Sequence, residues 1–467
     1  MLVCCDLEQK LASWPLKSSQ VKSVVEILRV KSSQVKSRPL CGRRREHARL
    51  YMPMRALPLS LRAAARELGR LPEVADARRL LASNDLAGAL RNLRRAAQIV
   101  EYVPMPPLRL AALGTLAQVL RVKGSSSEEA KTWTGATELC AGAPDDGAAT
   151  MRLHALSGAA TCALHRAEPV AVLGHCAAAS SLASTPLWQH TFGLHSALAQ
   201  LQRGSVLDAS ATLEELERRQ ADMPSATSKP ADPEGEALAA CAEGVQLLRG
   251  DALAMAGDTE AARARWTTLL PTSSAPNSSH SSHSAPNADA AAASPAAKRA
   301  RALREVAARC RVGRSLLTPG AALDASLARI HLVRALDVCE SELPREVGLL
   351  ASTLGELAAL FASQGEFVAA EGLYRSALDP LMSGRPTSAA EAAQLLAPAH
   401  AFAELLGRLE FNGKPRVSEA DRLRALAAAL HAVHPEALPA GREWLGLEPW
   451  YASTCEVDWL GECAGEL

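Results

Sequence analysis

The clearest periodic pattern in this sequence lies in residues 351–380, where apolar and small side chains recur with helical spacing in two successive segments. Ser363-Gln364-Gly365-Glu366 separates the segments, and Pro380 is expected to end the second. The positions expected to face inward are Leu354, Leu357, Ala358, Phe361, Ala370, Tyr374 and Ala377. Because side chains three and four residues apart share a helix face, the pattern predicts a helical hairpin with close contact at its small residues.

Weaker versions of this pattern recur along the chain. In each, an apolar helical segment is followed by a short turn and a second segment with small residues in phase. The expected turn residues are Asn84, Gly124, Ala167, Gly204 and Gly257. Their spacings of 40, 43, 37 and 53 residues predict hairpins that are longer than a compact repeat requires.

The hairpin of residues 351–380 resembles a tetratricopeptide repeat, whose period is about 34 residues. Its sequence, STLGELAALFASQGEFVAAEGLYRSAL, is most similar to the repeats of kinesin light chains. One such hairpin cannot bury its own apolar face, so neighbouring hairpins must stack on it. The resemblance therefore implies an all-α fold, a solenoid of stacked helical hairpins.

Composition agrees with helices that pack through small residues. The chain is 48% hydrophobic and 3% aromatic, and its 11 cysteines include no CxxC pair. Cysteines in apolar helical segments are expected to be buried free thiols, as in a reducing compartment: Cys162, Cys176, Cys241, Cys310 and Cys339. No apolar run reaches the ~20 residues of a membrane-spanning helix, so we expect a soluble protein.

Charge and complexity divide the chain into five regions. Residues 1–66 have a net charge of +10 and the remainder −9, which argues against direct nucleic-acid binding by the folded part. The expected regions are a basic low-complexity extension (1–53), a helical array (54–270), a Ser/Ala/Pro linker (271–297), a second array (298–440) and a Trp-rich cap or tail (441–467).

The N-terminal extension has more than one interpretation. Residues 17–23 and 31–37 repeat the sequence KSSQVKS without a helical stripe, which favours a disordered extension. A basic arm, a targeting signal, or initiation at Met52 or Met54 are the alternatives. If the protein starts at Met54, its Arg-rich beginning resembles a mitochondrial transit peptide, and it is equally suited to be the first helix of the array.

The linker and the C-terminal segment are the other two non-repetitive regions. Residues 271–297 are expected to be a flexible linker, in which His280 and His283 lack further metal ligands. The C-terminal segment contains Trp450 and Trp459, and it is interpreted either as a cap over the last helix pair or as a partner-docking segment.

Residues with catalytic potential lack the surroundings that an active site needs. No P-loop, Rossmann glycine motif, HExxH or GxSxG sequence is present. His431 and His434 share a helix face near Glu436, but no second motif completes a metal site, and His190 and His195 are expected to be exposed. The sequence therefore predicts a protein that is not an enzyme and needs no cofactor, metal or small-molecule substrate.

One short basic motif stands apart from the array pattern. Lys298, Arg299 and Arg301 fit the pattern of a monopartite nuclear import signal next to the linker. The alternative is that these residues form the polar face at the start of a helix. Localisation is accordingly expected to be nuclear or cytoplasmic, with mitochondrial import through the Met54 segment as the alternative.

Stacked hairpins of this family form a concave groove, which implies binding of an extended peptide or helix of a partner protein. The family places groove specificity on the first helix of each repeat, which here points to Glu356, Ala359, Leu247 and Asp251. Residues 76–220 are also faintly similar in spacing to the cohesin-loading factor family, which works in the nucleus. The sequence thus predicts a scaffold or adaptor, possible roles being a subunit of a nuclear complex or a mitochondrial assembly factor.

Overall fold

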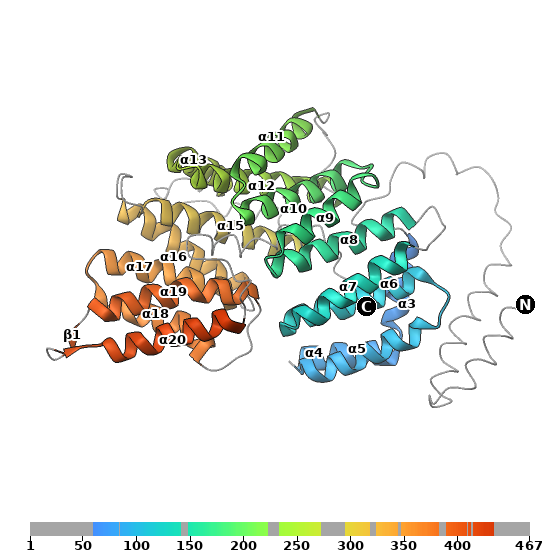
Figure 1. The fold of residues 1–467 in the computed structure, drawn as a ribbon, viewed down its shortest axis with the longest axis horizontal. Helices are drawn as coiled ribbons and strands as arrows, with labels where there is room; N and C mark the ends of the chain where they lie inside the picture. Colours follow the sequence, from blue (N-terminus) through green and yellow to red (C-terminus); the bar gives the residue numbers. More distant parts are fainter. Residues whose placement is uncertain are drawn as a thin grey trace, which may run out of the picture. The chain divides into compact units, whose positions relative to one another are not determined.

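The computed structural model of the chain describes the following residues: 59–83, 85–141, 148–222, 233–271, 295–317, 324–343, 347–382, 389–408, 410–411 and 414–433. Within these ranges the fold is all-α apart from one two-residue strand pair (Figure 1). This agrees with the fold class predicted from the hydrophobic pattern. Residues 1–53 and the expected C-terminal cap lie outside the described ranges.

The helices of the described chain, in order, are α3 (Leu59–Gly69), α4 (Pro72–Ala82), α5 (Leu86–Glu101), α6 (Pro106–Lys123), α7 (Ser126–Ala141), α8 (Ala148–His165), α9 (Pro169–Ser180), α10 (Pro186–Arg203), α11 (Val206–Asp222), α12 (Pro233–Met255), α13 (Thr259–Thr268), α15 (Pro295–Ser315), α16 (Ala325–Glu342), α17 (Val347–Ser363), α18 (Phe367–Met382), α19 (Ala389–Arg408) and α20 (Val417–Val433). The strands β1 (Glu410–Phe411) and β2 (Lys414–Pro415) form an antiparallel pair between α19 and α20, with Phe411 opposite Lys414.

From α4 onward, consecutive helices pack as antiparallel pairs, from α4 with α5 through to α19 with α20. The second helix of each pair also contacts the first helix of the next pair, as α5 contacts α6 and α7 contacts α8. First helices further contact one another, for example α10 with α12 and α17 with α19. This connectivity is that of an α-solenoid of stacked hairpins.

The turns within the hairpins use one recurring backbone geometry. The residues with positive φ in the described chain all belong to expected turns, with φ values of 77° at Gly124, 51° at Ala167, 80° at Gly204, 93° at Gly257 and 79° at Gly365. The expected turn residue Asn84 lies outside the described residues. At each positive-φ residue, the amide of the following residue donates to the carbonyl five residues earlier, as Glu366 does to Phe361 (2.9 Å). This is the Schellman C-cap, which satisfies helix-end carbonyls and reverses the chain.

The hairpin of residues 351–380 folds as its pattern predicts. Leu357, Ala358, Ala370, Tyr374 and Ala377 are all at most 2% exposed, with the turn at Gly365 between α17 and α18. Leu354 and Phe361, also expected to face inward, are half-buried and pack against the buried cluster that includes Ala358 and Tyr374. The expected end at Pro380 is wrong by two residues, since α18 continues to Met382. Pro380 lacks an N–H and its ring crowds the carbonyl four residues earlier, so the helix ends within the next turn.

The hydrophobic core includes helices that precede residues 271–297 and helices that follow them. One cluster of buried residues extends from Ala160 to Leu360, and it includes Trp266 of α13 and Leu303 of α15. The helices α13 and α15 contact each other directly, and Arg263 Nε donates to Ser315 Oγ at 3.0 Å. Helices from both expected arrays therefore share a core, while the exact domain limits proposed from sequence stay a prediction.

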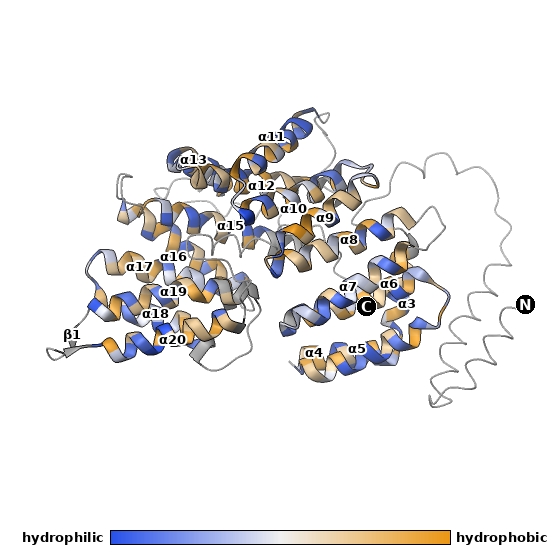
Figure 2. Ribbon diagram, in the orientation of Figure 1, coloured by the Kyte–Doolittle hydropathy of each residue, from blue (hydrophilic) through white to orange (hydrophobic). Residues whose placement is uncertain are grey.

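The two helices of a hairpin differ in how much of their surface is buried. In Figure 2, α5 and α20 alternate between hydrophilic and hydrophobic residues along their length. First helices such as α10 have few exposed positions, because α10 contacts α8, α9, α11 and α12. The same helix contains Leu198 and Leu201, which are at most 1% exposed. Free surface in the described chain is thus concentrated on the second helices.

Candidate partner-binding surface

Two of the expected groove residues are not at the surface. Leu247 and Asp251 of α12 are both 0% exposed, so the expectation of exposed groove positions is wrong for them. The reason is the surroundings of α12, which contacts α10, α11, α13 and α15. Sequence spacing placed both residues on one helix, but it could not predict that neighbours cover the helix on every side.

Asp251 forms a buried ion pair between two first helices. Arg311 of α15 donates to its two carboxylate oxygens at 2.7 and 3.0 Å, and the Arg311 side chain is 5% exposed. Burial raises the pKa of Asp251 to about 6, although Arg311 opposes the shift. A bidentate contact of this kind fixes the register of α12 against α15, and it leaves no carboxylate for a ligand.

The other two expected groove residues lie on α17. Glu356 accepts a hydrogen bond from Arg314 Nε of α15 at 2.8 Å, and its side chain is 12% exposed. Ala359 is half-buried. The Glu356 carboxylate, like that of Asp251, therefore joins successive first helices.

The remaining expected site residues lie either at the start of helix α15 or outside the described residues. Lys298, Arg299 and Arg301 lie in the first two turns of α15, and Arg301 is exposed whereas Ala302 is buried. This placement agrees with the alternative in which the basic motif begins a helix. Trp450 and Trp459 lie outside the described residues, so the two interpretations of residues 441–467 both stay open.

His190 and His195 are buried, at 2% and 0% exposure, so their expected exposure is wrong. His195 Nε2 lies 3.3 Å from the Thr161 hydroxyl of α8, and its ring meets that of Phe192 edge-on at 5.7 Å. Burial, together with nearby His175, lowers the pKa of His195 to about 3. The neutral imidazole is therefore a packing element of the α8–α10 interface.

The cysteines follow the sequence expectation with one change. Cys162, Cys241, Cys310 and Cys339 are buried free thiols, while Cys176 is half-buried. Burial raises the pKa of Cys310 to about 11. Since the thiolate is the nucleophilic form, the Cys310 thiol is suited to packing. Among the described residues, no group of three or more His, Cys, Asp or Glu is arranged to bind a metal.

Exposed apolar side chains gather on the later second helices, at a location that the sequence analysis missed. Of the ten large hydrophobic residues exposed in the described chain, six lie on α16, α18 and α20. We call these six the apolar edge: Leu327, Ile330, Val333, Phe367, Val368 and Val417. All except Val333 lie in the first two turns of their helices, so the edge follows one end of three successive second helices.

Contacts between the helices hold the apolar edge together. The guanidinium of Arg329 on α16 lies over the Phe361 ring near the end of α17, 5.1 Å from its centroid. Helix α17 then turns at Gly365 into Phe367 and Val368, which are 43% and 89% exposed. The start of α16 is thus linked to the start of α18 through the end of α17.

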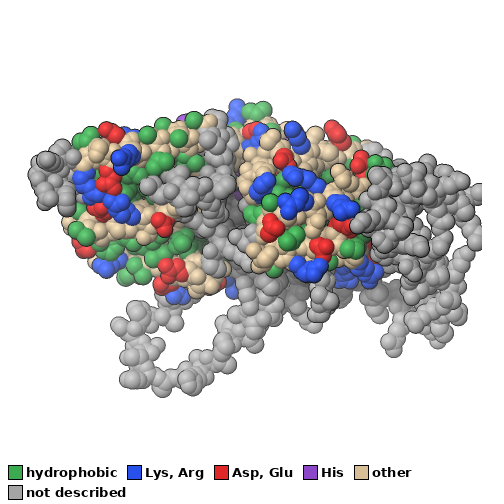
Figure 3. Space-filling view, turned by 90° about the horizontal axis from the view of Figure 1, so that it is seen from below, with side chains coloured by type: hydrophobic (Ala, Val, Ile, Leu, Met, Phe, Trp, Pro, Cys, Tyr) green, Lys and Arg blue, Asp and Glu red, His purple; other side chains and the backbone are tan. Residues whose placement is uncertain are grey.

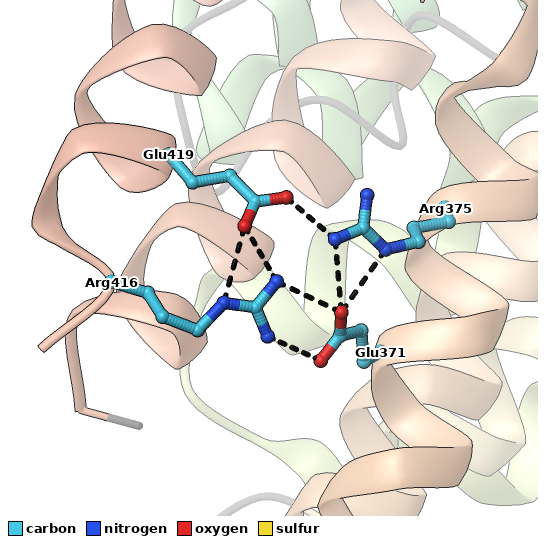
Figure 4. Close-up of polar contacts among 4 residues, drawn as sticks. All are labelled: Glu371, Arg375, Arg416 and Glu419. Atoms are coloured by element: carbon cyan, nitrogen blue, oxygen red, sulfur yellow. Dashed lines mark hydrogen bonds and ion pairs between the residues drawn. The ribbon is translucent and has the colours of Figure 1, made fainter. Parts of the chain in front are cut away.

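A four-residue ion-pair network joins α18 to α20 (Figure 4). Glu371 accepts hydrogen bonds from Arg375 of its own helix (2.9 Å) and from Arg416 (2.6 Å), while Arg416 and Arg375 both contact Glu419. The hydrogen bond from Arg416 holds the pKa of Glu371 below its ordinary value. All four charges are matched, so the network contributes rigidity and no net charge to the apolar edge.

The apolar edge had a signal in the sequence. Leu327, Ile330 and Val333 are spaced by three, on the side of α16 opposite the buried Ala328, Leu332 and Ala335. Two apolar rows on opposite sides of one helix indicate a second contact surface. Only the packing of α16 against α15 and α17 shows which of the two rows is exposed.

Comparison with known proteins adds no assignment. No protein-family model matches the chain, and no curated protein matches it. In the described ranges, no helix is long and apolar enough to span a bilayer.

Proposed function

We propose that this protein is a non-enzymatic scaffold or adaptor that binds a segment of a partner protein on a solenoid of stacked helical hairpins. The observation that carries the proposal is the apolar edge, where three second helices expose six large hydrophobic side chains, five of them in the first two turns. Exposed apolar surface that is contiguous on a folded domain typically marks a protein-binding site.

The occupant that fits the apolar edge is an apolar stretch of a partner, bound as a helix or an extended peptide. The row Leu327, Ile330 and Val333 matches the side of a helix that presents residues at intervals of three or four. The charges near the edge are largely matched by the network of Figure 4, so the surface selects apolar side chains more than charge. This supports the edge as the main binding surface in place of the buried groove positions.

The test is affinity purification of the tagged full chain from its own cells, compared with the variant Ile330→Lys, Val368→Lys. Both side chains are at least 63% exposed, so the variant is expected to fold. We expect its main co-purifying protein to fall at least ~10-fold, because two charges would enter an apolar contact. The matched control is Leu207→Lys on α11, which changes an 86%-exposed residue outside the edge.

Three results would contradict the proposal. If no protein co-purifies with the tagged wild-type chain in an amount comparable to the chain itself, the scaffold function is contradicted. If recovery is equal for the wild type and the edge variant, the edge is not the binding surface. If light scattering shows a dimer that the edge variant abolishes, the occupant is a second copy of the chain.

For the compartment, we propose the nucleus, with a complex such as a cohesin loader as the setting, on the basis of Lys298, Arg299 and Arg301 and the faint family resemblance. The second candidate is a mitochondrial assembly factor imported through the segment from Met54. Recovery of chromatin proteins supports the first. A mature N-terminus downstream of Met54, together with mitochondrial partners, supports the second.

A further inference from the structure

The three successive helices α8, α9 and α10 hold five of the chain's 12 histidines and contain no aspartate or glutamate. The histidines are His154, His165, His175, His190 and His195. Glu168, in the turn between α8 and α9, is the one acidic residue between Ala148 and Arg203. On the face that Figure 3 shows, by contrast, acidic and basic side chains are intermixed. The imidazoles of α8 to α10 therefore have no carboxylate on their own helices.

Helices α8 and α10 pack against each other along a seam that has an imidazole at each end (Figure 1). At one end, His154 of α8 meets the Trp188 ring of α10 edge-on, with ring centroids 4.8 Å apart. Trp188 stacks on Phe192 at 5.9 Å, and Phe192 meets His195 edge-on at 5.7 Å. At the other end, His195 Nε2 lies 3.3 Å from the Thr161 hydroxyl of α8. We call these five residues the imidazole seam.

The hydrogen bonds of His195 suit only its neutral form. Thr161 donates its hydroxyl proton to the Ser157 carbonyl, so its oxygen accepts from the N–H at Nε2 of the neutral ring. The other ring nitrogen, Nδ1, is buried and has no hydrogen-bond partner among the described residues. A proton on Nδ1 would be a charged donor without an acceptor, which is costly in a buried site. Burial accordingly lowers the pKa of His195 to about 3 and that of His154 to about 4.

The helices that surround the imidazole seam do not supply a balancing charge either. Helix α6, which packs on α8, has no acidic residue. The titratable group that acts on His195 is His175 of α9, whose charged form would repel an imidazolium. Among the described side chains of α7, α11 and α12, each buried or half-buried carboxylate is paired with an arginine: Glu129 with Arg121, Glu215 with Arg219, Glu217 with Arg265, Glu243 with Arg304 and Asp251 with Arg311.

We propose that the imidazole seam is an acid-sensitive hinge of the solenoid, in which protonation of His154 and His195 separates α8 from α10, with α9 as the connection between them. The opened state binds two more protons than the closed state, so a falling pH shifts the equilibrium toward opening. Six buried residues, Trp188 and Phe192 among them, form a hydrophobic cluster separate from the main one, so this part of the seam can open locally. Because rotation between neighbouring hairpins sets the curvature of a solenoid, opening one seam changes the shape of the array.

Hydrogen–deuterium exchange of the full chain at pH 7 and pH 5, corrected for the intrinsic exchange rate, measures opening of the seam. A histidine that stays neutral when buried and titrates normally when exposed favours the open state ~30-fold at pH 5. With two such histidines, we expect the protection of α8 and α10 to fall by up to ~10³ between pH 7 and pH 5. Protection is expected to change little in α17 and α19, whose one histidine, His400, is exposed.

The variant His154→Gln, His195→Gln keeps polar side chains in the seam and removes both protonation sites. It is expected to lose most of the pH dependence of protection at α8 and α10, while each single variant keeps a ~30-fold effect. The control His400→Gln removes an exposed imidazole on α19 and is expected to behave as the wild type does. Circular dichroism at pH 7 checks folding. Because each protein is compared with itself at two pH values, a general loss of stability cancels, and the single variants test the hinge if the double variant does not fold.

The inference is overturned if α8 and α10 lose no more protection than α17 and α19 when the pH falls to 5, because the seam then does not open ahead of the array. It is also overturned if the histidine variants keep the wild-type ratio of protection between the two pH values. Neither outcome bears on partner binding at the apolar edge, which lies on α16, α18 and α20.

Discussion

At the residue scale, several ion pairs and the buried His195 imidazole of the described chain lie between first helices. Glu243 with Arg304, Asp251 with Arg311, and Glu356 with Arg314 each join α15 to a neighbour. Only the Asp251–Arg311 pair is buried on both sides, and breaking such a pair by removing one partner typically costs ~3–5 kcal/mol, because the other charge is left without compensation. Such pairs specify which helices meet and in what register, in addition to the apolar contacts around them.

His195 is expected to make the protein sensitive to acid. Its pKa is about 3 in the folded state against 6.5 ordinarily, so below pH 6.5 the unfolded chain binds a proton that the native state does not. The free energy of unfolding therefore falls as pH drops from 6.5 toward 3. In His195→Leu this part of the loss disappears, which at pH 5 corresponds to ~2 kcal/mol.

Urea unfolding at pH 7 and pH 5 measures this effect. The substitution leaves Thr161 satisfied, because its hydroxyl also donates to the Ser157 carbonyl at 3.0 Å. His431→Leu serves as control, since His431 is exposed on α20. Equal pH dependence in the wild type and His195→Leu would show that the His195 imidazole is not the group that couples folding to pH.

At the element scale, the turns rather than the helices carry the repeated signature. Each positive-φ residue is followed by a helix that begins within two residues, and Asp258 at one such start accepts a hydrogen bond from the Ala261 amide at 3.0 Å. An N-cap of this kind contributes ~1 kcal/mol, and the Schellman bonds before it satisfy the preceding helix. The hairpins are therefore specified locally, before their apolar faces meet.

Two of the turns predict substitutions with opposite effects on the free energy of unfolding. Ala167 has φ of 51°, so Ala167→Gly is expected to raise the free energy of unfolding by up to ~1 kcal/mol, as strain at Cβ is relieved. Gly365 has φ of 79°, so Gly365→Ala is expected to lower it by ~1–2 kcal/mol. No atom lies within 4 Å of a Cβ built at Gly365, so the cost is one of backbone conformation.

Chemical denaturation of the wild type, Ala167→Gly and Gly365→Ala tests the turn geometry, with Gly372→Ala in helix α18 as control. Gly372 also has no atom within 4 Å of a built Cβ but lies inside the helix, so this change is expected to stabilise by up to ~1 kcal/mol. If Gly365→Ala and Gly372→Ala shift stability in the same direction, the left-handed turn at Gly365 is wrong.

At the scale of the whole molecule, the solenoid is continuous across the Ser/Ala/Pro segment. The buried cluster includes residues of α12 and α13 before that segment and of α15 to α17 after it. A core shared in this way couples the two expected arrays, because neither can bury its last helix without the other. The proposed apolar edge lies near the C-terminal end of the described array, on α16 to α20.

Replacing residues 273–293 with a Gly/Ser sequence of equal length is expected to leave one cooperative thermal transition, with the free energy of unfolding changed by less than ~0.5 kcal/mol. Loop-closure entropy is preserved at constant length, and the α13–α15 contacts do not involve the replaced residues. Arg263→Ala, which removes the hydrogen bonds to Ser315, is the comparison that should weaken the junction. Separate transitions for the two halves in the Gly/Ser protein would contradict a shared core.

The sequence by itself determined the helices, their pairing into hairpins and the turn positions, because helical periodicity and left-handed glycine turns are local properties. Gly365 and the small residues Ala358 and Ala370 were sufficient to identify the clearest hairpin. Only the tertiary structure decided which helix faces are free. Asp251 and His195 are buried, while Val368 and Arg91 are exposed, because burial depends on contacts between hairpins whose register the pattern of one helix does not contain.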